Sequence, residues 1–207
     1  MSIRSFALLS LIALFSFGNV SLANDRFELV ADIVGLYQRD ARRILGSEIY
    51  LMADGKDDEG PNAYASFNGP MGAPRIRLTK ALLREFEDEE VAATVCHELG
   101  HFFGDLRIGT RDPGLAIEAE ADYFAGGCLM RYLTEGCGIS TSRAESIAID
   151  IARNEAQAFE RRLLNPDRAV SEQAHGILKG YPNANCRLLT VFHGIRGYRR
   201  PTCWYNP

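Results

Sequence analysis

The feature that most constrains this chain is a largely apolar segment, residues 89–103, in which a glutamate directly follows the first of two histidines. Its apolar side chains recur on most sides of a helix, which predicts that the helix is buried. They are Val91, Ala92, Val95, Cys96, Leu99, Phe102 and Phe103. His97 and His101 are one helical turn apart and share a face. Because buried imidazoles need partners, the chain must fold so that both rings meet a common partner.

The two histidines belong to the motif His97-Glu98-Leu99-Gly100-His101, which is typical of helical zinc sites. Neutral imidazole is a good ligand for Zn²⁺. Glu98 is rotated by about 100° from His97, which is too far to bind the same ion but suitable for taking a proton from water. We therefore predict that His97 and His101 bind zinc and that Glu98 is the catalytic base. The alternative is a pair of surface histidines, which the apolar neighbours disfavour.

A second acidic motif follows one loop later. A catalytic zinc commonly has three protein ligands and one open position. Glu118 and Asp122 are four residues apart and share a helix face, whereas Glu120 points to the opposite side. We predict that Glu118 is the third zinc ligand and that Asp122 accepts a hydrogen bond from a zinc-bound histidine. The alternative is an acidic helix face exposed to solvent.

Strand patterns are short and lie in the first half of the chain. Alternating apolar residues predict strands over 49–53, 62–67 and 75–78. The last two flank a turn rich in glycine and proline, so we expect them to form a hairpin.

Helix patterns account for most of the remainder. The predicted helices cover 25–45, 80–86, 89–103, 115–133, 141–164 and 167–178, with one more short helix within 183–207. Thr79, Asp88 and Thr141 have the chemistry of N-cap residues. The sequence thus predicts an α+β fold, mostly helical, with a small sheet packed on the helix that carries the histidines.

Composition limits the class of protein. Hydrophobic residues make up 46% of the 207 residues and charged residues 24%, as in ordinary globular proteins. The formal net charge of -4 provides no basic surplus, so we expect no nucleic-acid partner.

The N-terminus has the pattern of a secretory signal peptide. A short positive start precedes an apolar run, 6–17, that is shorter than the roughly 20 residues needed to span a bilayer. Small residues up to Ala23 form the expected cleavage site, so residues 1–23 are the predicted signal peptide and 24–207 one mature domain. The alternative is an uncleaved membrane anchor. We expect a periplasmic or secreted protein with no stable membrane insertion after cleavage.

Five cysteines are present, and export would allow them to pair. Sequence alone does not define connectivity. The pairs Cys128–Cys137 and Cys186–Cys203 are favoured because each encloses a short loop with turn residues. Cys96 would then be an unpaired, buried, apolar residue. The second of these pairs would hold a cysteine-containing C-terminal tail.

Three motifs follow one another along the chain: Asn62-Ala63 in a predicted strand, the histidine motif at 97–101, and the acidic pair at 118–122. Their order, over about residues 60–126, resembles the gluzincin peptidases that include the heat-shock protease HtpX and the CAAX prenyl protease. The resemblance implies a zincin fold of the minigluzincin type, peptide hydrolysis, and a substrate lying along the strand near 75–78.

The chain departs from this family in two respects. Lys80-Ala81 replaces a glycine that commonly follows the strand, and the membrane helices of the best-known members are absent. The resemblance is therefore to a soluble exported branch, whose substrates need not be those of the membrane-bound members.

These patterns together predict a zinc-dependent endopeptidase that acts on exported or envelope proteins, with Zn²⁺ as cofactor and proteins or peptides as partners. His175, His193 and Arg196 are unranked candidates for stabilising the oxyanion. One alternative is an exported zinc-binding chaperone or interaction module with a dormant site, or a site blocked by the tail. Another is a peptidoglycan or small-peptide hydrolase with the same zinc chemistry. The oligomeric state is not predicted.

Overall fold

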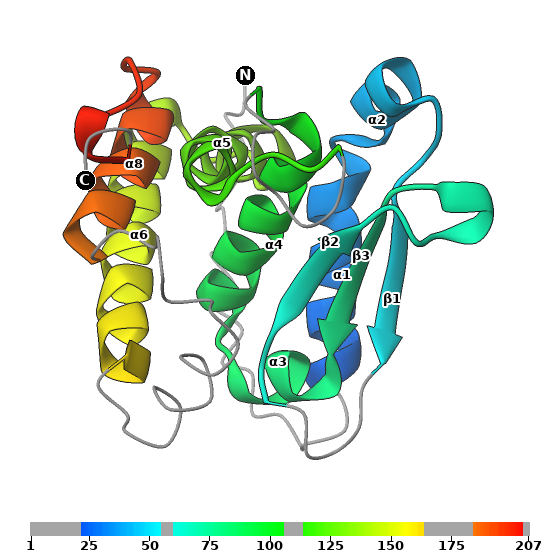
Figure 1. Cartoon of the computed structure of the whole chain (residues 1–207). Helices are drawn as coiled ribbons and strands as arrows, with labels where there is room; N and C mark the ends of the chain where they lie inside the picture. Colours follow the sequence, from blue (N-terminus) through cyan, green and yellow to red (C-terminus); the bar gives the residue numbers. More distant parts are fainter. Residues whose placement is uncertain (1–21, 55–59, 106–113, 164–183, 205–207) are drawn as a thin grey trace, which may run out of the picture.

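The computed structural model describes residues 22–54, 60–105, 114–163 and 184–204 (Figure 1). The predicted signal peptide, except for its last two residues, and the predicted helix over 167–178 lie outside the described residues. No helix within these ranges has the length and the apolar character needed to cross a membrane.

The N-terminal helical pattern forms two helices instead of the single one predicted over 25–45. Helix α1 covers Leu22–Gly35 and α2 covers Gln38–Leu45. The chain turns between them, where the Tyr37 amide donates to the carbonyl of Val34 at 2.9 Å. This turn keeps the Tyr37 side chain in the core beside Val34 and Ala41, all of which are buried. The break therefore coincides with a buried aromatic residue.

The sheet contains three short strands in the order β1-β3-β2. Strand β1 covers Tyr50–Asp54, β2 covers Ala63–Ser66 and β3 covers Arg75–Thr79. Strand β2 pairs with β3 in antiparallel fashion, so the predicted hairpin is confirmed, and β1 pairs with β3 in parallel. Strand β3 is therefore central. Both of its edges are occupied, so β3 itself has no free edge with which a substrate could pair.

Two capped helices follow the sheet. Helix α3, Lys80–Glu85, begins where the Thr79 hydroxyl accepts a hydrogen bond from the Leu82 amide at 3.2 Å, as the sequence predicts. Helix α4, Asp88–Phe103, carries the histidine motif. Its N-cap residue is Glu87 and not, as predicted from the sequence, Asp88. The Glu90 carboxylate accepts a hydrogen bond from the Glu87 amide at 3.1 Å, as in a capping box.

The remaining helices are α5, Glu118–Arg131; α6, Thr141–Leu163; and α8, Ala184–Arg196. A π-helical turn, Tyr132–Gly136, follows α5, and a short 3₁₀ turn, Thr202–Trp204, follows α8. In Figure 1 the sheet and α1 lie on one side of α4, and α6 and α8 lie on the other. The predicted α+β class, mostly helical with a small sheet, is confirmed.

Helix α5 packs closely on two neighbours through small residues. A Cβ atom added to Gly100 of α4 would lie 2.5 Å from the Cα of Ala121 in α5. A Cβ atom on Gly126 would lie 2.2 Å from the carbonyl oxygen of Val191 in α8, and one on Gly194 of α8 would lie 1.9 Å from that of Tyr123. Only glycine at these positions permits such short distances between helices, and α5 is thereby held between α4 and α8.

The disulfide pattern is partly different from the prediction. Cys186 and Cys203 are bonded, as expected. Cys96 is not free: it is bonded to Cys128, with 5.5 Å between their Cα atoms, and Cys137 is the exposed free cysteine. The predicted pair Cys128–Cys137 is therefore wrong. The short loop between them misled the prediction, because Cys128 lies on the side of α5 that packs on α4.

Candidate active site

The two histidines of α4 lie side by side, with their ring centroids 4.9 Å apart and their planes perpendicular. Their side chains are 17% and 13% exposed, so both rings reach a partly open surface from a buried helix. Leu99 and Phe102, on the same helix, are fully buried and hold it in the core. The motif thus places both imidazoles at the edge of the core.

Each imidazole is oriented by an acceptor at its Nδ1 atom. Nδ1 of His97 lies 2.8 Å from Oδ1 of Asp122, and Nδ1 of His101 lies 2.8 Å from the carbonyl oxygen of Ala116. A carbonyl oxygen can only accept, so His101 carries its hydrogen on Nδ1. In the neutral ring this tautomer has its lone pair on Nε2, as metal binding requires.

The carboxylate of Glu118 faces both Nε2 atoms. Its Oε2 atom lies 3.0 Å from Nε2 of His97, and its Oε1 atom lies 3.7 Å from Nε2 of His101. Glu118 is the first residue of α5 and its side chain is 32% exposed. The structure therefore brings the sequence-predicted third ligand to the two histidines.

The start of α5 explains this position. The sequence predicts a helix from 115, but residues 115–117 precede the first turn. Here the Ala116 amide donates to the His101 carbonyl at 2.7 Å, and the Ala116 carbonyl accepts from the His101 ring. Because Ala116 is paired with His101 in this way, the helix begins only at Glu118. This starting point determines the position of the Glu118 carboxylate.

Glu98 lies in a cluster with His97 and His101. It is 8% exposed, and its carboxylate and the ligand atoms of His97 and His101 all lie within 4.8 Å of one another. A carboxylate beside two imidazoles in a sheltered position can exchange a proton with a nearby water.

Glu120 points away from this cluster, as expected. Its carboxylate accepts hydrogen bonds from Arg200, with distances of 2.6 and 2.7 Å. The guanidinium of Arg200 also lies over the ring of Tyr123 and contacts Asp105. Glu120 therefore connects α5 to the C-terminal segment.

Electrostatics at His97 favour a positive charge between two carboxylates. Burial lowers the pKa of His97, but hydrogen bonds with Asp122 and Glu118, and their charges, outweigh burial and raise the pKa to about 10. Burial raises the pKa of Asp122, but Arg187 and then His97 hold it below its ordinary value. A divalent cation could replace the proton between His97 and Glu118.

The donor set fits zinc. Two imidazole Nε2 atoms and one carboxylate are typical ligands of a catalytic zinc, and both imidazoles have the supporting acceptors that such ligands usually have. The residues that could hold the ion are His97, His101 and Glu118.

Sequence reasoning missed one residue of this site. Arg187 of α8 donates two hydrogen bonds to Asp122, although the two residues are 65 positions apart. No spacing or motif connects them in the sequence. Two of the residues predicted as candidates for stabilising the oxyanion have partners of their own. His193 contacts the carbonyl of Arg199, and Arg196 contacts Glu145. His175 lies outside the described residues.

This fold and this donor set have the features expected of one class of protein, the zinc metallopeptidases. The comparison with protein families agrees, because residues 25–106 match the model of peptidase family M48. This match supports placing the chain in the M48 family of zinc metallopeptidases. The matched region extends from α1 to just beyond α4, so it includes His97, Glu98 and His101 but not Glu118. Comparisons with curated proteins and with solved structures found no match.

Proposed function

We propose that this protein is a zinc-dependent endopeptidase that hydrolyses peptide bonds in exported or envelope proteins through a metal-activated water. His97, His101 and Glu118 bind the zinc, Glu98 is the catalytic base, and Asp122 orients His97. The observation that carries this proposal is the convergence of two Nε2 atoms on the carboxylate of Glu118, with Glu98 within 4.8 Å of the imidazoles.

The roles follow from the chemistry of each group. Zinc, when bound, supplies Lewis acidity that makes water more acidic and polarises the scissile carbonyl. The Glu98 carboxylate accepts the proton of the attacking water and then delivers it to the leaving amine. Partial burial of Glu98 excludes competing solvent, and its helix holds it beside the two imidazoles.

The substrate binds along β2 in this proposal. Strand β2 packs against α4, which carries the histidines, and it lies at the edge of the sheet. Among the described strands, only β3 pairs with it. An extended peptide could therefore add to the outer edge of β2 by main-chain hydrogen bonds. The exposed ring of Tyr64, which stacks with Arg77, would lie beside such a peptide.

Export is part of the proposal. Residues 1–23 act as a cleaved signal peptide, and 24–207 form one peptidase domain in the periplasm or outside the cell. Two disulfide bonds support this location, because such bonds persist in oxidising compartments. The protein would represent a soluble exported branch beside the HtpX and CAAX prenyl proteases.

The family match favours a peptidase over the rival role of an exported zinc-binding chaperone with a dormant or self-blocked site.

The contacts of the C-terminal segment concern the rival in which this segment blocks the site. Arg200 pairs with Glu120, the Tyr198 carbonyl accepts from Tyr123, and Cys203 is bonded to Cys186. These contacts attach the segment to α5 and α8.

A paired measurement of metal content and proteolysis tests the proposal. The purified mature protein should hold about one zinc per chain and cleave an unfolded protein such as casein. Glu98→Gln should retain zinc and lose about 10²- to 10⁴-fold in cleavage, since only proton transfer is removed. Glu89→Gln, an exposed glutamate on the same helix, is the control and should behave as wild type. Absence of zinc from wild type, or cleavage unaffected by Glu98→Gln, would overturn the assignment.

A further inference from the structure

We propose that Arg187 is a positioning residue of the metal site, which acts on His97 through Asp122. This inference rests on the proposed zinc site and extends it to a residue on α8. Arg187 holds the Asp122 carboxylate in one orientation, so that the carboxylate in turn fixes the His97 ring with Nε2 directed at the zinc position.

The contact between Arg187 and Asp122 has the geometry of a strong ion pair. Nε of Arg187 donates to Oδ2 of Asp122 at 2.8 Å, and Nη2 donates to Oδ1 at 2.6 Å. This two-pronged arrangement defines the plane of the carboxylate as well as its position. Oδ1 also accepts from Nδ1 of His97 at 2.8 Å. One oxygen therefore connects the guanidinium to the imidazole.

Burial makes this pair necessary for an ordered site. The side chain of Asp122 is 4% exposed and that of Arg187 is 19% exposed. A buried carboxylate without a cationic partner is costly, and it relieves the cost by moving or by taking up a proton. Either change would weaken the hydrogen bond to His97 and free its ring to rotate.

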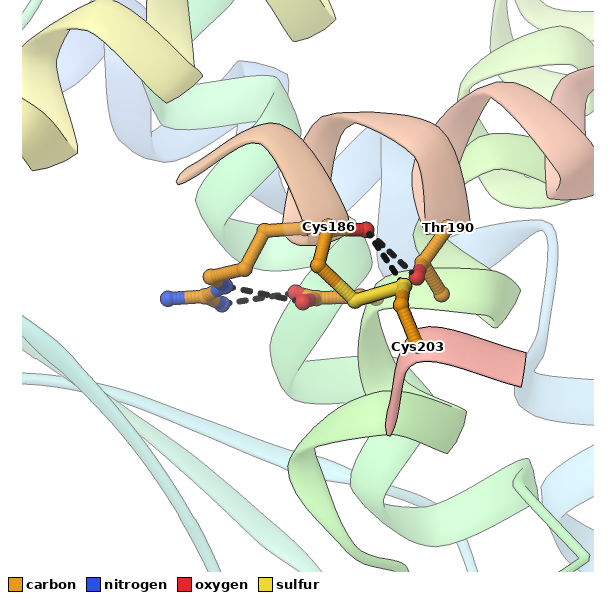
Figure 2. The surroundings of a disulfide bond; sticks show 5 residues. Cys186, Thr190 and Cys203 are labelled. Atoms are coloured by element: carbon orange, nitrogen blue, oxygen red, sulfur yellow. Dashed lines mark hydrogen bonds and ion pairs between the residues drawn. A yellow bond between two sulfur atoms is a disulfide. The ribbon is translucent and has the colours of Figure 1, made fainter. Parts of the chain in front are cut away.

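Arg187 is itself held in place by its neighbours on α8. The adjacent Cys186 is bonded to Cys203, and the carbonyl of Cys186 accepts a hydrogen bond from Thr190 at 2.7 Å (Figure 2). Further along the helix, Gly194 packs directly against the main chain of α5. Helix α8 is thus held near both of its ends. The main chain of Arg187 is therefore fixed, and its guanidinium has little freedom to leave Asp122.

In this arrangement the C-terminal part of the chain has a role in the site. The two histidines lie within the region that matches the peptidase family, residues 25–106, whereas Arg187 and Asp122 lie beyond it. The metal site would therefore depend on a helix that contains none of its ligands.

Zinc affinity, measured by competition with a chromogenic chelator, provides the test. The variants are Arg187→Gln, Arg187→Lys, Asp122→Asn and the double variant Arg187→Gln/Asp122→Asn. The control is Arg131→Gln, because Arg131 is also partly buried and paired with a carboxylate, that of Asp40. Spectra of the Co²⁺-substituted proteins report the ligand geometry, and thermal melting shows that each variant is folded.

Arg187→Gln should weaken zinc binding by about 10- to 100-fold, the range for residues that support metal ligands. Arg187→Lys should lose less, because it retains the charge but not the two parallel bonds. The double variant should bind zinc no more weakly than Asp122→Asn, since Arg187 acts through Asp122. The Co²⁺ spectrum should change in Arg187→Gln and remain unchanged in Arg131→Gln.

The outcomes separate this inference from the proposed function. If wild type binds zinc and Arg187→Gln binds it as tightly as Arg131→Gln, the role of Arg187 is refuted while the zinc site stands. If the losses of Arg187→Gln and Asp122→Asn are additive, Arg187 does not act through Asp122. If wild type binds no zinc, the proposed function fails first. Should Arg187→Gln not fold, Arg187→Lys carries the same comparison.

Discussion

Each of the two histidines is oriented by one acceptor, and the two acceptors differ in kind. The partner of His101 is a main-chain oxygen, that of Ala116, which no side-chain substitution removes. The partner of His97 is the side chain of Asp122, which in turn depends on Arg187. The orientation of His97 is therefore the more sensitive to mutation, and it is the point at which distant parts of the chain can affect the site.

Two glutamates of α5 should separate metal binding from stability. Glu118→Gln removes the charged ligand from the site and should lower zinc affinity by at least about 10-fold, with little change in the unfolding free energy of the metal-free protein. Glu120→Gln breaks a buried pair with Arg200, whose side chain is 36% exposed, and should cost about 1–3 kcal/mol of stability while zinc affinity is retained. Chelator competition and denaturant unfolding measure the two effects. Equal zinc affinity of Glu118→Gln and wild type would remove Glu118 as a ligand.

How far the sequence predicts the site depends on the distance between residues along the chain. His97, Glu98 and His101 share one helical turn, and Glu118 and Asp122 share another, so helical spacing is enough to group them. Arg187 and the bond between Cys96 and Cys128 depend on how α8 and α4 pack on α5. No local pattern encodes that packing, so both were missed.

At the level of elements, α5 organises the site because it contacts α4 on one side and α8 on the other. Both contacts are made at glycines, Gly100 of α4 and Gly194 of α8, which let the main chains approach closely. The bond between Cys96 and Cys128 crosslinks α4 to α5 next to the first histidine. These three contacts, spread along α5, hold the helix and with it Glu118 against its neighbours.

Gly100 therefore has a role beyond the spacing of the motif. In Gly100→Ala the new methyl group would meet the main chain of Ala121, at 2.5 Å from its Cα, and α4 and α5 would have to separate. We expect a loss of about 1–3 kcal/mol in unfolding free energy and weaker zinc binding, because Glu118 moves with α5. Gly35→Ala, where nothing lies within 4 Å, is the matched control and should be neutral. Unchanged stability of Gly100→Ala would show that this contact does not position α5.

Sequence periodicity predicted the elements better than their ends. The helix expected over 25–45 breaks at Tyr37, whose ring is drawn into the core beside Phe103 and Phe124. The helix expected from 115 starts at Glu118, because Ala116 is paired with His101. In both places a tertiary contact overrides a local preference. The central position of β3 was also not predictable. It results from parallel pairing with β1, which lies on the edge of β3 opposite to its hairpin partner β2.

At the scale of the whole molecule, the candidate ligands come from two helices that are separate in the unfolded chain. A metal that needs both helices binds the folded state alone and therefore stabilises it. The bond between Cys96 and Cys128 already crosslinks α4 to α5, so zinc would act as a second connection between these two helices.

Removal of the metal should consequently lower the melting temperature. With free zinc at about 100 times its dissociation constant, the added stability is about 2.7 kcal/mol, which for a chain of this size corresponds to roughly 5–10 °C. Chelation should therefore shift the thermal transition of wild type downward by about that amount. Glu98→Gln should show the same shift, because Glu98 is not a ligand, whereas His101→Ala should melt at one temperature with or without chelator. A chelator-independent transition in wild type that holds stoichiometric zinc would mean that the ion is bound somewhere other than between α4 and α5.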